Sequence, residues 1–340
     1  MDDATSSTQP ESVKPVSPQP KQADLEEIVT KAFVGRNGIR AGWRILIFLV
    51  IVGALIAGAG AIAMLFAKGK QPNVPFNAGG VGVSEGILFV CALVASVIMA
   101  KIEGRRVADY GLPVSEAFGK KFWQGTLIGF ASITALLLAM RLVRVFYFGT
   151  IALQRGQIVK YAALWALAFL MVGFLEEFLF RGYALFTATT GITFWPAAIL
   201  SSLLFGYVHH GNSGENWLGA FNAGAVGFLF CLILRRTGSL WMAIGFHAAW
   251  DWGETYFYGV PDSGLVAPGH LFNPSFSGPV WLTGGSVGPE GSWLCLALIV
   301  ILWVIFATCF REVKYPNPGA IPDPRRRERE PLSILTAPEQ

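Results

Sequence analysis

Residues 161–186 read YAALWALAFLMVGFLEEFLFRGYALF, an apolar stretch long enough to cross a bilayer that nevertheless contains three ionisable side chains. These are Glu176, Glu177 and Arg181. An ionisable group at bilayer depth costs at least ~2.5–3.5 kcal/mol on insertion scales, so such groups are usually paired, turned inward and functional. The stretch therefore predicts a membrane-spanning helix with a polar site, although a charge cluster that only fixes helix packing would leave the same pattern.

Helical geometry separates the roles of the two glutamates. On a helix, Glu177 and Arg181 are four residues apart and can form an ion pair. Glu176 is five residues from Arg181, roughly 140° around the helix axis. We therefore expect Glu177 to pair with Arg181 and Glu176 to remain free for other chemistry.

The composition is that of a polytopic membrane protein. Of the 340 residues, 53% are hydrophobic and 14% are charged, and the mean hydropathy is +0.51. The positive charge flanks apolar runs and forms no basic stripe with interleaved aromatic residues, so we expect no nucleic-acid partner. The four cysteines lie within apolar runs without CxxC spacing, which argues against a disulfide framework and against a cysteine-rich zinc site.

Eight apolar segments predict an all-α, polytopic bundle of about eight transmembrane helices. The segments are residues 43–67, 85–101, 122–141, 161–186, 194–211, 216–234, 240–258 and 292–310. We expect residues 1–30 to be a disordered N-terminal tail, residues 31–310 to be one transmembrane domain, and residues 311–340 to be a basic C-terminal tail. Lys and Arg gather in alternate connections, which predicts an integral membrane protein with both termini cytoplasmic. The lack of an organelle signal favours a bacterial plasma (inner) membrane.

Three connections differ from the rest. Residues 68–84 have the composition of a Pro/Gly/Asn loop. Residues 259–291 are expected to be a long Gly/Pro-rich outer loop. This loop could serve as an irregular connector, as a lid or as a partner surface. Residues 142–160 carry Arg144, Arg155 and Lys160 on the outer side, against the general trend, and we expect a surface helix there.

Two further motifs place histidines in apolar segments. Phe205 and His209 are four residues apart, so the phenyl ring can wall and orient the imidazole. His247 and Asp251 share one helical face, where a carboxylate can fix the imidazole tautomer and the pair can bind a metal or a water. Each pair alone could be structural. Together with Glu176, they would form a polar site built from three segments.

Such a site has the groups that amide hydrolysis needs. The reaction requires a base for water, donors for the oxyanion and a proton donor for the leaving amine. One glutamate and two histidines supply these roles, either directly or through a metal. Depths estimated from continuous helices differ between Glu176, His209 and His247, so the three converge only if a helix is tilted, broken or displaced.

The three motifs together resemble the CAAX-processing and bacteriocin-processing (CPBP, or Abi) intramembrane metalloproteases, which include the type II CAAX prenyl endopeptidases. That family carries EExxxR, FxxxH and HxxxN or HxxxD on successive helices, and the resemblance covers residues 160–258. Asp251 stands where Asn is frequent among the prenyl-processing members, which adds a charge and removes an amide donor. The matching residues are Glu176, Glu177 and Arg181, then Phe205 and His209, then His247 and Asp251.

The resemblance implies an endopeptidase that cuts a membrane-anchored or prenylated (CAAX-type) peptide in the lipid bilayer. It implies that Glu176 and His209 activate water, and that His247 and Asp251 stabilise the oxyanion or hold a metal. Zinc is the candidate metal, with those four residues as candidate ligands, while Glu177, Arg181 and Phe205 support the site. Two alternatives remain: a proton-linked transporter, and a non-catalytic bacteriocin-immunity or peptide-binding membrane protein.

Overall fold

The computed structural model describes residues 31–35, 38–66, 77–212 and 214–317. The expected N-terminal tail, residues 1–30, lies outside the described residues, as does most of the expected C-terminal tail. The chain divides into a small unit that ends at Arg40 and a large unit that begins at Ala41. In the small unit, β1 (Val34–Gly35) pairs antiparallel with β2 (Gly38–Ile39).

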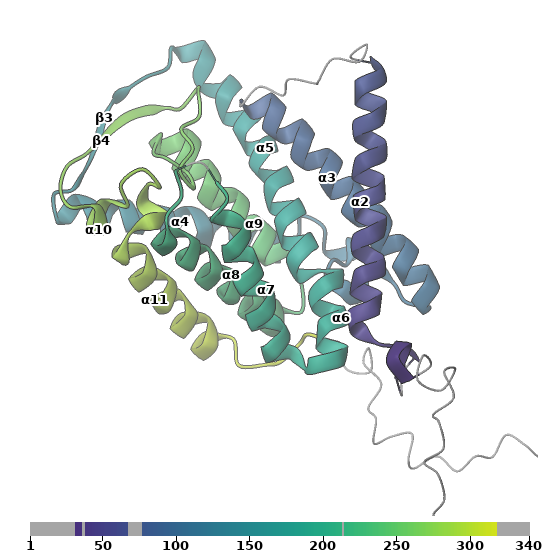
Figure 1. The fold of residues 1–340 in the computed structure, drawn as a ribbon. Coiled ribbons are helices and arrows are strands. Elements are labelled where there is room, and N and C mark those ends of the chain that lie inside the picture. Colours follow the sequence, from purple (N-terminus) through teal and green to yellow (C-terminus); the bar gives the residue numbers. More distant parts are fainter. Residues whose placement is uncertain (1–30, 36–37, 67–76, 213, 318–340) are drawn as a thin grey trace, which may run out of the picture. The chain divides into compact units, whose positions relative to one another are not determined.

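The large unit is a helical bundle (Figure 1). Its long helices are α2 (Ala41–Phe66), α3 (Ala78–Glu103), α4 (Lys120–Leu142), α5 (Arg155–Arg181) and α8 (Trp217–Thr237). Its shorter helices are α6 (Tyr183–Ile192), α7 (Phe194–His209), α9 (Trp241–Asp251), α10 (Val280–Thr283) and α11 (Trp293–Cys309). The 3₁₀ turns η1 (Val107–Tyr110), η2 (Val114–Glu116) and η4 (Pro289–Gly291) and the π-helix η3 (Trp252–Tyr258) complete it.

The helices of the bundle have the length and the apolar composition of an integral membrane protein. Among the described residues, five helical segments are long and apolar enough to cross a membrane: 41–66, 78–103, 120–142, 155–192 and 217–237. Helices α7 and α11 are apolar but shorter. Many large apolar side chains lie exposed on the surface, for example Phe66 on α2, which is 86% exposed. The predicted helical membrane bundle is confirmed, and each of the eight expected segments contains a helix.

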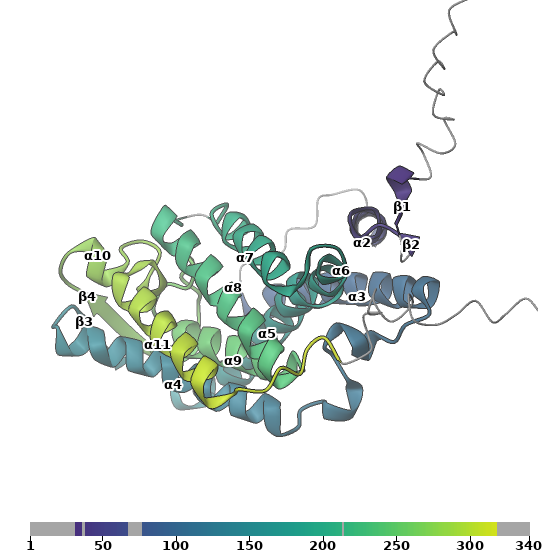
Figure 2. The same cartoon turned by 90° about the horizontal axis from the view of Figure 1, so that it is seen from below.

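The helices pack in two rows. In the first row, α2 packs on α3, α3 on α5, α5 on α9, and α9 on α4. In the second row, α6 packs on α7, α7 on α8, and α8 on α11. Figure 2 shows the two rows side by side, with α5 near the middle of the first. Contacts of α5 with α7 and of α8 with α9 join the rows, so the motif-bearing helices α5, α7 and α9 meet near the centre.

Close contact between α4 and α9 depends on small residues. A Cβ atom at Gly129 would lie 2.1 Å from the carbonyl oxygen of Phe246. Any side chain there would push α4 away from the helix that carries His247. Small residues let two membrane helices approach closely, which gains van der Waals contact where no water is present to drive association.

Helix α3 begins earlier than the sequence suggests. Residues 68–84 were predicted to be a loop, but the helix begins at Ala78. The side chain of Asn77 accepts a hydrogen bond of 3.0 Å from the backbone N–H of Gly80, and such a cap stabilises the first turn. Residues 68–76 lie outside the described part of the chain. For residues 78–84 the prediction was wrong, because the cap offsets the poor helix propensity of several glycines. The extension places Glu85 well inside a helix.

The stretch 161–186 is not one continuous helix. α5 ends at Arg181 and α6 begins at Tyr183, with Gly182 between them at φ −81° and ψ −115°. A Cβ atom at Gly182 would lie 2.3 Å from the carbonyl oxygen of Phe178, so this break requires glycine. The break redirects the chain ahead of α7. His209 at the end of α7 then reaches α5, despite the depths estimated from continuous helices.

Where a surface helix was expected in residues 142–160, the structure has a strand at residues 146–151 and the start of α5 at residues 155–160. β3 (Phe146–Ile151) pairs antiparallel with β4 (Phe272–Phe276) from the outer loop. Phe146 faces Phe276 across the pair, with ring centroids 5.4 Å apart. Aromatic residues favour strands because they pack well across a pleated pair. The loop 259–291 is therefore tied to the bundle by a ladder and is not irregular throughout.

Candidate active site

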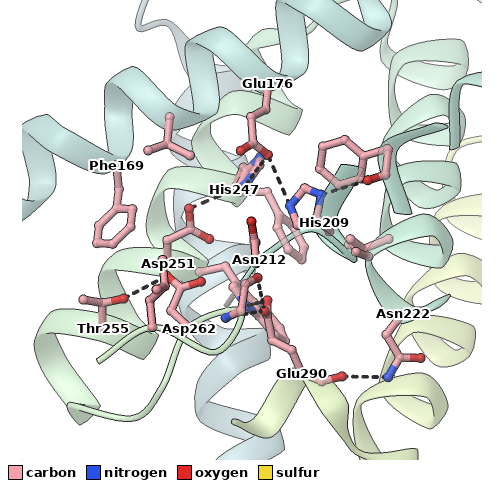
Figure 3. A pocket seen from close by; sticks show the side chains of 18 of the residues that line it. Phe169, Glu176, His209, Asn212, Asn222, His247, Asp251, Thr255, Asp262 and Glu290 are labelled. Carbon is pink, nitrogen blue, oxygen red and sulfur yellow. Dashed lines mark hydrogen bonds and ion pairs between the residues drawn. The ribbon is translucent and has the colours of Figure 1, made fainter. Parts of the chain in front are cut away.

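Glu176 lies between the two motif histidines. Its Oε2 atom is 3.7 Å from Nε2 of His209 and 3.7 Å from Nε2 of His247. The three residues come from α5, α7 and α9, and Figure 3 shows their side chains pointing toward one another. The structure therefore brings together the three residues that the sequence suggests, across separations of 33 and 38 positions along the chain.

The backbone fixes the orientation of His209. Its Nδ1 atom lies 2.9 Å from the carbonyl oxygen of Phe205, one turn earlier in α7. A carbonyl oxygen only accepts, so Nδ1 carries the hydrogen, and the lone pair of the neutral ring is on Nε2. The ring of Phe205 packs on the imidazole with centroids 4.3 Å apart, as expected from the spacing. Nε2 is thus presented to Glu176 as an acceptor.

Glu177 orients His247. The Nδ1 atom of His247 lies 2.9 Å from Oε1 of Glu177, so Nδ1 donates to the carboxylate and Nε2 faces the site. Asp251 lies on the other side, with its Oδ2 3.5 Å from Nε2. We expected Asp251 to fix the tautomer of this histidine. That role belongs to Glu177, because the carboxylate of α5 reaches the ring nitrogen that faces away from the site.

Arg181 completes a buried chain of charges. Its guanidinium lies 3.3 Å from Oε1 of Glu177, and both side chains are 0% exposed, which confirms the predicted ion pair. The guanidinium also lies 4.0 Å from the ring centroid of Phe205, a cation–π contact. The pair holds the Glu177 carboxylate in place for His247. The same Phe205 therefore contacts both the arginine and His209.

Glu176 differs from its neighbour in exposure. Its side chain is 24% exposed, and its Oε2 has no hydrogen-bond partner among the residues that the structure describes. It lines a cavity of about 440 Å³ together with His209, His247 and Asp251. Apolar side chains, among them Trp165, Phe169, Val172 and Phe230, form other parts of the wall. The cavity therefore combines the Glu176 carboxylate with a partly apolar lining, a combination typical of small-molecule and peptide sites.

The cavity contains further polar residues that the sequence did not point to. Glu85 of α3 and Asn212, just after α7, line it. Glu85 was hidden because it fell at the edge of a predicted loop. Asn212 lies two residues after His210 and belongs to none of the three motifs. Neither residue could be assigned to the site before the packing of α3 on α5 and the end of α7 were known.

Two acids from the loop 259–291 also line the cavity, and they are shown in Figure 3. These are Asp262 and Glu290. Burial raises the pKa of Asp262 to about 7, with the nearby Glu290 carboxylate contributing, while the hydroxyl of Thr255, which donates to Asp262 Oδ2 at 2.8 Å, opposes the shift. The loop was expected to be a connector, a lid or a partner surface, and these acids show that it forms part of the cavity wall.

Glu176, His209 and His247 do not hold all three of their ligand atoms within 4.8 Å of one another, as a shared zinc ion would require. Both Nε2 atoms are free to act as ligands, and each lies 3.7 Å from Glu176. Ligands on a tetrahedral zinc lie about 2.0–2.2 Å from the metal, so all pairs of ligand atoms must be close together. Within the described part of the chain, three ligand atoms within 4.8 Å of one another occur at Glu254, Asp262 and Glu290 and not at Glu176, His209 and His247.

Comparison with known proteins supports the motif-based assignment. Residues 158–253 match the family model described as Rce1-like, type II CAAX prenyl endopeptidase Rce1-like. No curated protein and no solved structure matches the chain. The matched segment runs from α5 to the start of η3 and contains all three motifs. Residues 158–253 are therefore similar to the Rce1-like type II CAAX prenyl endopeptidases, in agreement with the resemblance of the three motifs.

Proposed function

We propose that this protein is an intramembrane endopeptidase that hydrolyses a peptide bond in a membrane-anchored or prenylated (CAAX-type) substrate. One observation carries the proposal: Glu176 faces the free Nε2 atoms of His209 and His247 inside a cavity of about 440 Å³. The family match supports protease activity at the level of the family. It favours neither the transporter nor the immunity alternative.

Glu176 and His209 are placed to activate water. The 3.7 Å between Glu176 Oε2 and His209 Nε2 is too long for a direct hydrogen bond. A water at about 2.8 Å from each atom fits between them and would donate one hydrogen to each acceptor. Glu176 takes a proton as the water oxygen attacks the scissile carbonyl carbon. The protonated Glu176 then returns that proton to the leaving amine as the C–N bond breaks.

His247 is placed to stabilise the oxyanion. Its Nδ1–H donates to Glu177, and its Nε2 faces the cavity. With a second proton on Nε2, the ring would donate to the developing oxyanion. The carboxylates of Glu176, Glu177 and Asp251 surround the ring and would offset its positive charge. Asp251 and the buried Glu177–Arg181 pair therefore act by positioning and charge.

The lining of the cavity supports a lipid-linked substrate. Aromatic and aliphatic side chains of α3, α5 and α8 face it, and the surrounding helices have the apolar surface of a membrane protein. An apolar chain beside the scissile bond would bury its surface there at roughly 25 cal/mol per Å². The distribution of Lys and Arg supports cytoplasmic termini. The bacterial plasma membrane is the proposed location because the sequence suggests no organelle signal.

The test is cleavage of a quenched, farnesylated CAAX peptide by the full-length protein in proteoliposomes. Glu176→Gln should lower the cleavage rate by about 10²–10⁴-fold, the range for loss of a general base. Glu312→Gln is the matched control, because Glu312 is 79% exposed and lies beyond α11. 1,10-Phenanthroline should leave the rate unchanged if water is activated without zinc. Equal rates for Glu176→Gln and wild type would rule out the proposed base.

Other outcomes would redirect the assignment. If neither protein cleaves the prenylated peptide, an unlipidated membrane peptide is the next substrate to test. A flux that depends on a pH gradient would favour the transporter. A biological activity that survives Glu176→Gln would favour the immunity or peptide-binding alternative.

A further inference from the structure

We propose that Glu254, Asp262 and Glu290 form a binding site for a hard divalent cation such as Ca²⁺, which fastens the outer loop 259–291 to the end of the helix that carries His247. One ligand atom from each of the three carboxylates lies within 4.8 Å of the others. The three residues come from different segments: Glu254 from η3, Asp262 from the start of the loop and Glu290 from η4 at its end. Asp262 and Glu290 line the same cavity as Glu176, but none of the three carboxylates takes part in the proposed hydrolysis.

Among the residues described, the three carboxylates lack a positively charged partner, and Glu254 also has an unpartnered oxygen. Its side chain is 0% exposed, and its Oε1 atom has no hydrogen-bond partner in the described part of the chain. A buried carboxylate oxygen with no partner is costly, since burial removes water that would otherwise solvate it. No Lys or Arg occurs anywhere in residues 259–291. Within the described residues, no ion pair joins a lysine or arginine to any of the three carboxylates.

The neighbours of the cluster orient the carboxylates and leave ligand oxygens available. The indole N–H of Trp250 lies 2.8 Å from Oε2 of Glu254 and 3.0 Å from Oε1 of Glu290. The backbone N–H and the hydroxyl of Ser263 both donate to Oε2 of Glu290. These donors hold the carboxylates together despite their mutual repulsion. They supply too few hydrogens to satisfy six carboxylate oxygens, so a cation would complete the site.

The donor set selects the class of cation. All three ligands are carboxylates, and oxygen donors of this kind favour hard ions such as Ca²⁺ and Mg²⁺. Asp262 and Glu290 also line the cavity, so a hydrated ion can reach them from there. Ca²⁺ accepts irregular oxygen geometry more readily than Mg²⁺ does. We therefore expect Ca²⁺ to bind with the higher affinity.

Cation binding would couple the loop to the Glu176 site. Glu254 lies in η3, which continues α9 directly after Asp251. A cation held by Glu254, Asp262 and Glu290 joins both ends of the loop to this segment. Removing the ion would leave three facing carboxylates and loosen the loop that forms part of the cavity wall.

Terbium luminescence provides a direct test. The indole of Trp250 contacts two of the carboxylates, so excitation of tryptophan should sensitise Tb³⁺ bound in their place. The full-length protein in nanodiscs at pH 7 should bind one Tb³⁺, and Ca²⁺ should displace it. Glu290→Gln should weaken Ca²⁺ competition by roughly tenfold or more, as even indirect changes at metal sites cost 10–100-fold in affinity. Glu312→Gln should bind as wild type does.

A second variant and a second readout guard against misfolding. Asp262→Asn is nearly isosteric and should also weaken Ca²⁺ binding. Adding Ca²⁺ should raise the melting temperature of wild type but not that of either variant. Without Ca²⁺, both variants should melt within a few degrees of chelator-treated wild type. Absence of Ca²⁺-displaceable Tb³⁺ emission from folded wild type would overturn the proposal. Equal Ca²⁺ affinities for wild type and Glu290→Gln would overturn it as well.

Discussion

Replacing Glu177 with glutamine should strongly destabilise the protein. The change keeps the shape and an acceptor for His247 but removes the charge that faces Arg181, and both members of the pair are 0% exposed. At the 3.3 Å between the Arg181 and Glu177 atoms, with an effective dielectric constant of ~20, the lost attraction is about 5 kcal/mol. Breaking a buried pair by removing one partner typically costs about 3–5 kcal/mol, in agreement with this figure.

The assay is reversible unfolding of wild type, Glu177→Gln, Arg181→Met and the double variant in the same detergent. The double variant removes both charges, so it should be less destabilised than the sum of the two single changes. A coupling energy of about 1–3 kcal/mol is expected for side chains in direct contact. A cost below about 1 kcal/mol for Glu177→Gln, with no coupling, would refute a buried ion pair at this position.

Three further predictions concern packing, chemistry and pH. Gly129→Ala should cost about 1–3 kcal/mol of stability, because the new Cβ would lie 2.1 Å from the Phe246 carbonyl oxygen. Gly53→Ala should be neutral, because its Cβ would meet no described atom within 4 Å. Thermal unfolding of the two variants measures the difference. Asp251→Asn should keep peptide cleavage within about tenfold of wild type, while Asp251→Leu should abolish it, since a polar group must face the imidazole. In the presence of a chelator, the free energy of unfolding should fall as the pH rises from about 4 to about 7. Burial raises the pKa of Asp262 to about 7, so folding favours the protonated carboxyl group. Asp262→Asn should flatten this dependence of stability on pH.

Local spacing predicted the parts of the site that lie within one helix. The pairing of Glu177 with Arg181 follows from their four-residue spacing, and the structure has it at 3.3 Å. The packing of the Phe205 ring against the His209 imidazole follows in the same way. These contacts depend on helical geometry alone, so they do not require the tertiary fold.

Contacts between helices were harder to predict. Glu177 orients His247 from 70 residues away, and nothing in either motif indicates which carboxylate reaches the ring. The cluster of Glu254, Asp262 and Glu290 depends on a π-helix and on a loop closed by a β-ladder, and neither has a clear signature in the sequence. The break at Gly182 was missed because one glycine within a long apolar stretch is common in membrane helices.

The start of α3 shows a different limit of prediction from sequence. Glycines at 79, 80 and 82 favoured a loop on propensity, and one side-chain cap at Asn77 reversed the outcome. Propensity is a weak guide where a neighbouring helix offers a packing surface, and here α3 packs along α5. Glu85 entered the cavity wall as a result.

The most direct test of hydrolysis at Glu176 is isotope incorporation from H₂¹⁸O, read by mass spectrometry of the peptide products in proteoliposomes. Wild type should release a product with one ¹⁸O in its new terminal carboxylate, and Glu176→Gln should form that product at least about 10²-fold more slowly. Formation of the labelled product at the wild-type rate by Glu176→Gln would contradict the assignment of Glu176 as the base that activates water.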